Sequence, residues 1–155
     1  MPRLDRLPEA NRNNLSKLPV QVNQIGPFVP LPRPLAACRV AIVTTAGLHR
    51  RADKPFGPGE QGYRVIPVDT PAADLVQSHT SIGFDRVPIM RDVNVTFPID
   101  RLRELAARGR LRLAPNNYSF MGALRDTGRI ERETGPEIGR RLAGEGVEVA
   151  LITPT

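Results

Sequence analysis

The sequence predicts an α/β domain of the Rossmann-like type, with a mostly parallel sheet flanked by helices. In the second half, runs of β-branched and aliphatic residues alternate with amphipathic segments in the order strand, helix, strand, helix, strand. This order favours parallel pairing with right-handed crossovers. The chain has 155 residues, 40% of them hydrophobic, and can therefore bury one ordinary core, which favours a single folded domain.

The beginning of the chain differs in composition from the rest. Residues 1–35 hold seven of the sixteen prolines, and their apolar residues follow no sustained period. We therefore predict a proline-rich extended arm over residues 1–35, which wraps a neighbour or stays mobile. The α/β domain is expected to cover residues 36–155.

The domain begins with Arg39–Thr45, a continuous β-branched run that predicts a central strand buried on both faces. An Ala-Gly pair ends it, and residues 48–62 follow as a loop far longer than an ordinary connection. Loops of this length are usually binding loops or lids, or else disordered. Further strands are expected at residues 63–68 and 74–79.

Two helices are expected in the second half. Pro98 opens the first, which has one apolar face, and Gly109 ends it. Thr134 and Glu137 have the spacing of a capping box, which predicts a second helix that ends at Gly144 or Gly146. Strands are expected at residues 111–114 and 147–152, and a polar turn at residues 115–122.

The net charge of +6 does not by itself indicate nucleic-acid binding. Twenty of the twenty-two basic residues are arginine, and they are scattered among sixteen acidic residues rather than gathered in a run. Aromatic residues make up 5% of the chain and tryptophan is absent, whereas single-strand binding relies on aromatic side chains among basic ones. We expect solvated surface charge and no nucleic acid, with a basic RNA-associated domain as the less favoured alternative.

Cys38 is the only cysteine, so the chain forms no intramolecular disulfide and has no Cys-x-x-Cys pair. Because Cys38 precedes the first strand, at the end of the sheet opposite the expected site, we expect a small apolar core residue. The chain has no apolar run of 18 residues and no signal-peptide core. We therefore expect a cytoplasmic protein with no membrane segment.

Ligands of an open α/β sheet collect at the carboxyl ends of its strands, so the residues that follow each strand are the first candidates. Gly47 and His49 follow the first strand, and His79 ends the third. A histidine is the usual acid or base near neutral pH, but at a strand end it is more often a hydrogen-bonded structural residue. A lone glycine makes no dinucleotide fingerprint, so the alternative for Gly47 is a simple turn.

Asp92 and Asn94 form a second candidate pair, because on an extended chain residues two apart share a face. With a histidine they would form a polar cluster. Neither histidine has a clear carboxylate partner in the sequence, so no metal site is predicted. Turn or helix-cap roles are the stronger alternative for both residues.

The stretch NNYSFMG, residues 116–122, gathers a tyrosine, a serine and two large apolar residues directly after a strand. Tyr118 and Ser119 are its candidate site residues. The alternative is a loop whose Phe120 and Met121 plug the core. If the functional interpretation holds, Tyr118 and Ser119 converge with the candidates above at the carboxyl edge of the sheet.

Several stretches follow one another in a distinctive order: RVAIVTTAGLHRR, YRVIP, DTPAADLVQSH, SIGFDR, DVNVTFPIDRLRELAARG, NYSFMGA and GVEVALITP. Together they resemble the glycine/sarcosine/betaine reductase and D-proline reductase selenoprotein B family. The similarity spans roughly residues 28–155 with matched spacing, and FPIDRLREL joined to YSFMG is its most specific pair.

The resemblance implies a substrate-binding subunit of an oligomeric cytoplasmic reductase that cleaves a carbon–nitrogen bond of an amino acid or related amine. In such enzymes the amine is held as a Schiff base on a pyruvoyl partner subunit. A selenolate or a thiolate attacks the α-carbon, and a dithiol or thioredoxin-like reductant restores it. No cofactor is expected within the chain itself. The candidate residues are then His79 and Tyr118 for catalysis and Gly47, His49, Asp92, Asn94, Asn117 and Ser119 for substrate binding.

This chain departs from the family at two places. The family motif usually carries histidine where this chain has Asn117, so an acid or base role would be lost or would move to His79. The family's selenocysteine or cysteine directly follows the last strand, and this chain stops there at Thr155. The domain is therefore expected to be incomplete and inactive as it stands. The alternative is a non-catalytic binding or assembly paralogue.

We predict that the codon after Thr155 is UGA, read as selenocysteine. The frame beyond it should encode a loop containing proline and cysteine, then a helix and a further strand. Sequencing the locus tests this prediction. A UAA or UAG codon there, or no coding frame downstream, would favour the non-catalytic alternative.

Overall fold

The protein is seen in a computed structural model that describes residues 3–17, 29–81 and 85–154. The chain divides into two compact units, Met1–Pro30 and Leu31–Thr155. In the first unit a 3-10 turn, η1 (Leu4–Arg6), precedes the helix α1 (Glu9–Ser16), whose residues are all exposed. The prediction of an extended arm was therefore wrong over α1, and its part over residues 18–28 lies outside the described residues.

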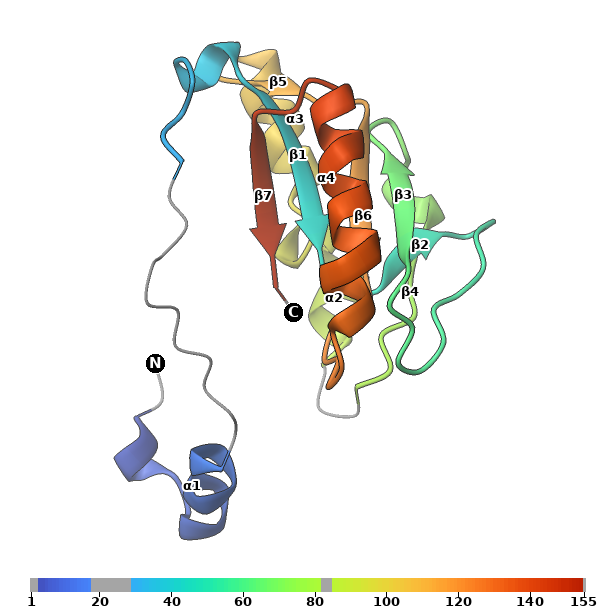
Figure 1. Cartoon of the computed structure of the whole chain (residues 1–155). Coiled ribbons are helices and arrows are strands. Elements are labelled where there is room, and N and C mark those ends of the chain that lie inside the picture. The colour runs from blue at the N-terminus through green and yellow to red at the C-terminus, as the bar shows by residue number, and fades with distance from the viewer. Residues whose placement is uncertain (1–2, 18–28, 82–84, 155) are drawn as a thin grey trace. The chain divides into compact units, whose positions relative to one another are not determined.

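The second unit is built on a five-stranded sheet with β1 (Arg39–Thr44) in its middle (Figure 1). β1 pairs in parallel with β7 (Val149–Thr153), with β5 (Arg112–Leu113) and with β6 (Asn116–Phe120). The hydrogen bonds along β1 alternate between its two edges: Arg39 O accepts from Glu148 N before β7, and Val40 O accepts from Ala114 N after β5. β5 and β6 therefore share one edge of β1, and β7 occupies the other.

The remaining strand of the sheet, β3 (Tyr63–Pro67), pairs antiparallel with β6. The sheet is thus mostly parallel with one antiparallel edge, which confirms the predicted α/β class. β7 forms the opposite edge, and no strand among the described residues pairs with its outer side. Two apolar side chains of β7 remain accessible there, since Leu151 is 36% and Ile152 65% exposed.

The segment from β5 to β6 contains a bulge of two extra residues relative to β1. Leu113 pairs with Val40 and Tyr118 with Val43, so five steps on this strand face three on β1. Pro115 lies in this bulge and has no N–H to donate.

The side-chain amide of Asn117 bonds to the backbones of both neighbouring strands at this bulge. Its Oδ1 accepts from Ile42 N of β1 at 2.8 Å, and its Nδ2 donates to Ile66 O of β3 at 3.4 Å. The prediction of a polar turn at residues 115–122 was therefore wrong, because the burial of β6 between two strands outweighs the turn preference of asparagine and serine.

Helices cover both faces of the sheet (Figure 1). One face packs against α2 (Val87–Arg91), the turn η4 (Val93–Val95) and α3 (Ile99–Ala107), with Ile42, Phe97 and Leu102 in the shared core. The other face packs against α4 (Gly135–Gly144), with Tyr118 and Ile138 in the core. The helix expected after Pro98 is confirmed as α3. None of the helices in the described ranges is long and apolar enough to cross a bilayer.

Two strands outside the main sheet occupy the region predicted as a long loop and a third strand. β2 (Leu48–Arg50) pairs antiparallel with β4 (Leu75–Gln77), which follows the turn η3 (Ala72–Asp74). The expected strand at residues 74–79 thus exists but does not join the main sheet. The connection after β2 is held by the buried Phe56, whose ring lies 4.2 Å from the Arg64 guanidinium and packs edge-on against His49.

The entry to α4 is a π-helical turn, η5 (Ile130–Thr134). The predicted capping box does not form, because Thr134 already has helical dihedral angles and its Oγ1 donates to Gln61 O at 3.0 Å. The wide turn brings backbone close to Gly135, where an added Cβ would lie 2.5 Å from Ile130 O. Only glycine fits there without displacing the backbone.

Gly135→Ala should therefore lower the free energy of unfolding by about 1–3 kcal/mol, as forced overpacking does. Gly139→Ala is the matched control in the same helix, because a Cβ at Gly139 meets nothing within 4 Å. It should raise stability by about 0.5–1 kcal/mol. Urea unfolding of the two variants measures both effects, and equal stabilities would contradict the close approach.

Candidate functional site

The carboxyl ends of the parallel strands carry a row of hydroxyl groups. Thr44 of β1 stands in register with Ser119 of β6 and with Thr153 of β7, so the three side chains lie on the same face of the sheet. Thr44 Oγ1 lies 3.3 Å from Thr96 O and 3.3 Å from Thr153 O. Ser119 Oγ and Thr153 Oγ1 are buried without a hydrogen-bond partner among the described residues. A polar ligand or a water can therefore bind at this row.

Gly47 and His79 meet beside the carboxyl end of β6. Gly47 has a φ of +64° and donates its N–H to Phe120 O at 2.9 Å. A Cβ at Gly47 would lie 3.2 Å from His79 N, so the close approach of the two segments requires glycine here. The structure thus brings these two predicted site residues together where the sequence analysis expected them.

The His79 ring is 1% exposed and fixed in orientation. Its Nδ1 accepts a hydrogen bond from Ser81 N at 3.2 Å, so in the neutral ring the proton is carried by Nε2. Burial, and then the positive charge of Arg86, lower the pKa of His79 below its ordinary value. The ring is therefore neutral at pH 7, and its Nε2–H is a hydrogen-bond donor.

Tyr118 does not join this group. Its side chain is buried against α4, and its hydroxyl donates to Glu145 Oε1 at 2.8 Å. Asn116, the first residue of β6, donates to the same oxygen at 2.9 Å, so the Tyr118 hydroxyl points toward the amino end of the strand. Burial and the bond to Glu145 raise the pKa of Tyr118. We therefore withdraw Tyr118 as an acid or base at the carboxyl edge.

The remaining candidates have structural partners. His49 is buried, with Nε2 2.8 Å from Ser78 Oγ and Nδ1 2.7 Å from Arg50 O. Asn94 Oδ1 accepts from Asp100 N at 2.9 Å and so caps the start of α3, while Asp92 Oδ1 accepts from Asn94 N at 2.9 Å. Asn117 bridges three strands, as described above. In the described ranges no three His, Cys, Asp or Glu side chains gather as metal ligands would.

A hollow of about 400 Å³ opens beyond the carboxyl end of β6. We call it the Arg125 hollow; its lining residues are Gly59, Gln61, Thr80, Gly122, Ala123, Leu124, Arg125 and Asp126. Ala123 has a φ of +54°, which is uncommon for a residue other than glycine and is often found at binding sites. Thr80 lines the hollow and directly follows His79 in the chain, so the hollow adjoins the segment in which His79 meets Gly47. Sequence analysis missed these residues, since a backbone dihedral angle leaves no signature in the sequence at an alanine.

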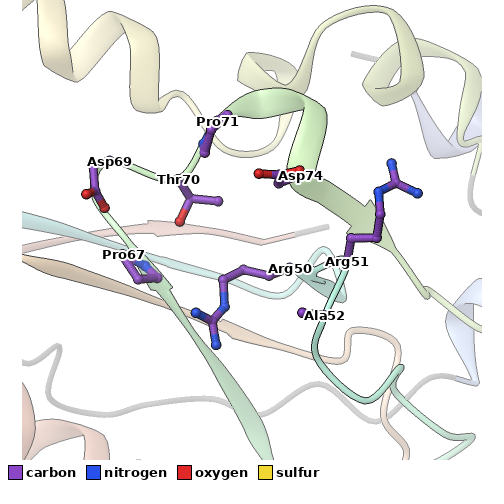
Figure 2. Close-up of a pocket in the computed structure, with 8 residues that line it drawn as sticks. All are labelled: Arg50, Arg51, Ala52, Pro67, Asp69, Thr70, Pro71 and Asp74. Atoms are coloured by element: carbon purple, nitrogen blue, oxygen red, sulfur yellow. The ribbon is translucent and has the colours of Figure 1, made fainter.

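A larger hollow of about 550 Å³ lies at the other end of the sheet, where Pro67 of β3 pairs with Asn116. Its lining includes Arg50, Arg51 and Asp74, and Figure 2 shows Arg50 reaching toward Pro67 while Arg51 points away from Thr70. Arg50 is held by Asp53, with 2.7 Å between Nη2 and Oδ1. Because this hollow is remote from the carboxyl ends of the parallel strands, we assign the candidate site to the Arg125 hollow and its neighbours.

Two curated proteins are similar to this chain. The D-proline reductase subunit gamma of Acetoanaerobium sticklandii is 43% identical over 128 residues, which cover 81% of this chain and 52% of that protein. The sarcosine reductase complex component B subunit beta of Peptoclostridium acidaminophilum is 25% identical over 145 residues, which cover 90% of this chain and 33% of that protein. The chain therefore spans about half and about a third of their lengths. No protein-family model and no solved structure matches it.

The lowered pKa of His79 makes stability depend on pH in a defined direction. Below about pH 6.5 the unfolded chain binds a proton at this ring that the folded chain does not, so stability falls as the pH is lowered from 7 to about 5. His79→Gln should remove this part of the pH dependence, and Arg86→Gln should reduce it because a neighbouring positive charge is lost. Urea unfolding at pH 7 and pH 5 measures the effect. Parallel pH profiles in the wild type and His79→Gln would contradict it.

Proposed function

Because this chain belongs to the selenoprotein B family of glycine, sarcosine, betaine and D-proline reductases, we propose that it is a subunit of a reductase complex acting on a secondary α-amino acid. The names of the two relatives support this substrate class. D-Proline and sarcosine both carry a secondary amine on the carbon that bears the carboxylate. A substrate of the same chemistry is therefore proposed for this chain.

The proposed reaction is a two-electron reduction that breaks the bond between the α-carbon and the nitrogen. The α-carbon and the nitrogen each gain one hydrogen, and a dithiol that is oxidised to a disulfide supplies the two electrons and two protons. A partner subunit with a pyruvoyl group belongs to the proposal, since the family resemblance implies it. The electrophilic carbonyl of that group would activate the amine.

Within the chain, the proposal is supported by His79, which lies beside Gly47 at the carboxyl end of β6. A neutral imidazole with its proton on Nε2 is suited to donate a hydrogen bond to the departing nitrogen, while the proton that this nitrogen gains comes from the dithiol as it is oxidised. The hydroxyl of Ser119 lies at the same edge of the sheet and has no partner among the described residues, although its side chain is fully buried and does not line the Arg125 hollow.

The nucleophile of the proposed reaction is not among the side chains of the described residues. Cys38 is fully buried before β1, with its Sγ 3.5 Å from Arg33 O and 3.6 Å from Pro34 O. It therefore lies at the amino end of β1, away from His79. We assign the nucleophile to the selenocysteine or cysteine that the resemblance expects directly after β7.

Reconstitution tests the proposed function. The chain extended through its expected downstream frame, with a cysteine codon in place of UGA, should oxidise dithiol in the presence of D-proline or sarcosine when combined with its partner subunit. Replacing the new cysteine by serine should abolish turnover, whereas Cys38→Ser should retain it. Activity of the 155-residue chain with the partner, or none from the extended chain with either substrate, would contradict the assignment.

A further inference from the structure

Arg125 shares its lack of an ion pair with Arg132 and Arg140 among the described residues, but of these three only Arg125 lines the Arg125 hollow. Arg129 is paired with Glu133 at 3.0 Å and Arg141 with Glu137 at 3.1 Å. Arg125 forms no ion pair or hydrogen bond with any of the residues 3–17, 29–81 or 85–154, although it lines the Arg125 hollow. A guanidinium without a protein partner in a concave site is suited to bind a carboxylate, which it can contact through two N–H groups.

Several hydrogen bonds hold the wall of the hollow beside Arg125. Gln61 Oε1 accepts from Arg129 N at 2.8 Å and from Ile130 N at 3.4 Å, and its Nε2 donates to Asp126 Oδ2 at 3.2 Å. Thr134 Oγ1 holds the Gln61 carbonyl from the π-helical turn. The loop before β3 and the entry to α4 are thus joined by hydrogen bonds.

Asp126 supplies a negative charge next to Arg125. Its Oδ1 accepts from Gly128 N at 2.9 Å, and this bond and the Gln61 amide hold its pKa below the ordinary value, so it is ionised at neutral pH. An ionised carboxylate has about four acceptor positions, and the described residues use two of them. The remaining ones can accept from an ammonium group.

Thr80 and Ala123 complete the hollow on the side of His79. Among the described residues the Thr80 hydroxyl donates to Met121 Sδ alone, at the long distance of 3.8 Å, so a better acceptor can replace this bond. The left-handed backbone at Ala123 is a local strain of the kind found at ligand sites. The volume of about 400 Å³ lies at the lower end of the range for small-molecule pockets.

We infer that the Arg125 hollow binds the substrate of the proposed reaction as a zwitterion, with the carboxylate on Arg125 and the protonated nitrogen facing Asp126. This inference rests on the proposed function and names the residues that select its substrate. Arg125 and Asp126 position the substrate and take no part in proton transfer. The recognised chemistry is an α-amino acid, and neither a carboxylate alone nor an amine alone satisfies both groups.

Equilibrium dialysis of the full 155-residue chain against labelled sarcosine and D-proline tests this assignment. Arg125→Gln should weaken binding at least tenfold. Arg129→Gln is the matched control. It removes the same charge four residues after Arg125, from a side chain that is already paired with Glu133, so it should leave binding unchanged. Asp126→Asn should weaken sarcosine binding but leave the weaker binding of acetate intact. Circular dichroism of each variant checks that the fold is retained.

The outcomes separate this assignment from the proposed function. If the reconstituted complex turns over sarcosine or D-proline while Arg125→Gln binds both as tightly as the wild type, the hollow is not the binding site and the reductase assignment stands. If the chain binds these amino acids through Arg125 and the reconstituted complex never consumes them, the hollow is supported and the reductase assignment fails. Equal weakening by Arg125→Gln and Arg129→Gln would also overturn the assignment, because it would reflect net charge alone.

Discussion

The sheet depends on one constraint, the two-residue bulge between β5 and β6. Pro115 lies in this bulge and has no N–H to donate; Val68 N donates to Pro115 O, and Val68 O accepts from the Arg103 guanidinium. At the same bulge the Asn117 side chain accepts from Ile42 N of β1 and donates to Ile66 O of β3. Beyond it, β6 sets Ser119 level with Thr44 and ends at Phe120, whose carbonyl accepts from Gly47 N. The positions of the candidate site residues therefore follow from the register that β6 adopts after this bulge.

Much of the fold could be predicted from the sequence, where local signals and tertiary packing agree. β1 is a long β-branched run, and α3 has an apolar face between Pro98 and Gly109. β6 could not be predicted, because Asn116, Asn117 and Ser119 favour turns in isolation and only burial between two strands makes them extended. The short strand β2 and the π-helical turn leave no periodic signal at all.

Some residues of the candidate site could likewise be predicted from the sequence, and others could not. Gly47 and His79 could be found because the ends of strands can be located from the sequence. The direction of the Tyr118 side chain could not, since it depends on Glu145, which becomes its neighbour only when α4 packs on the sheet. Arg125 gave no signal, because the sequence does not show which arginines line a hollow and lack an ion pair with the residues that the structure describes. The resulting site combines the neutral hydrogen-bond donor His79 with the Arg125 hollow, which begins at the next residue, Thr80, and is lined by one positive and one negative side chain.

The π-helical turn also determines how α4 faces the sheet. In a regular α-helix, at about 100° per residue, Ile130 would lie about 80° from Ile138 and about 120° from Leu142 around the axis. A π turn takes up one extra residue, which reduces both angular offsets to about 20°. All three side chains then point the same way, and all three do pack in the core beneath α4. The extra residue of the π turn, which requires glycine at position 135, thus rotates the residues before it around the helix axis. The apolar side chains of the turn and of α4 then form one continuous stripe. This stripe begins near the loop that carries Asp126 and continues along the helix that covers Tyr118.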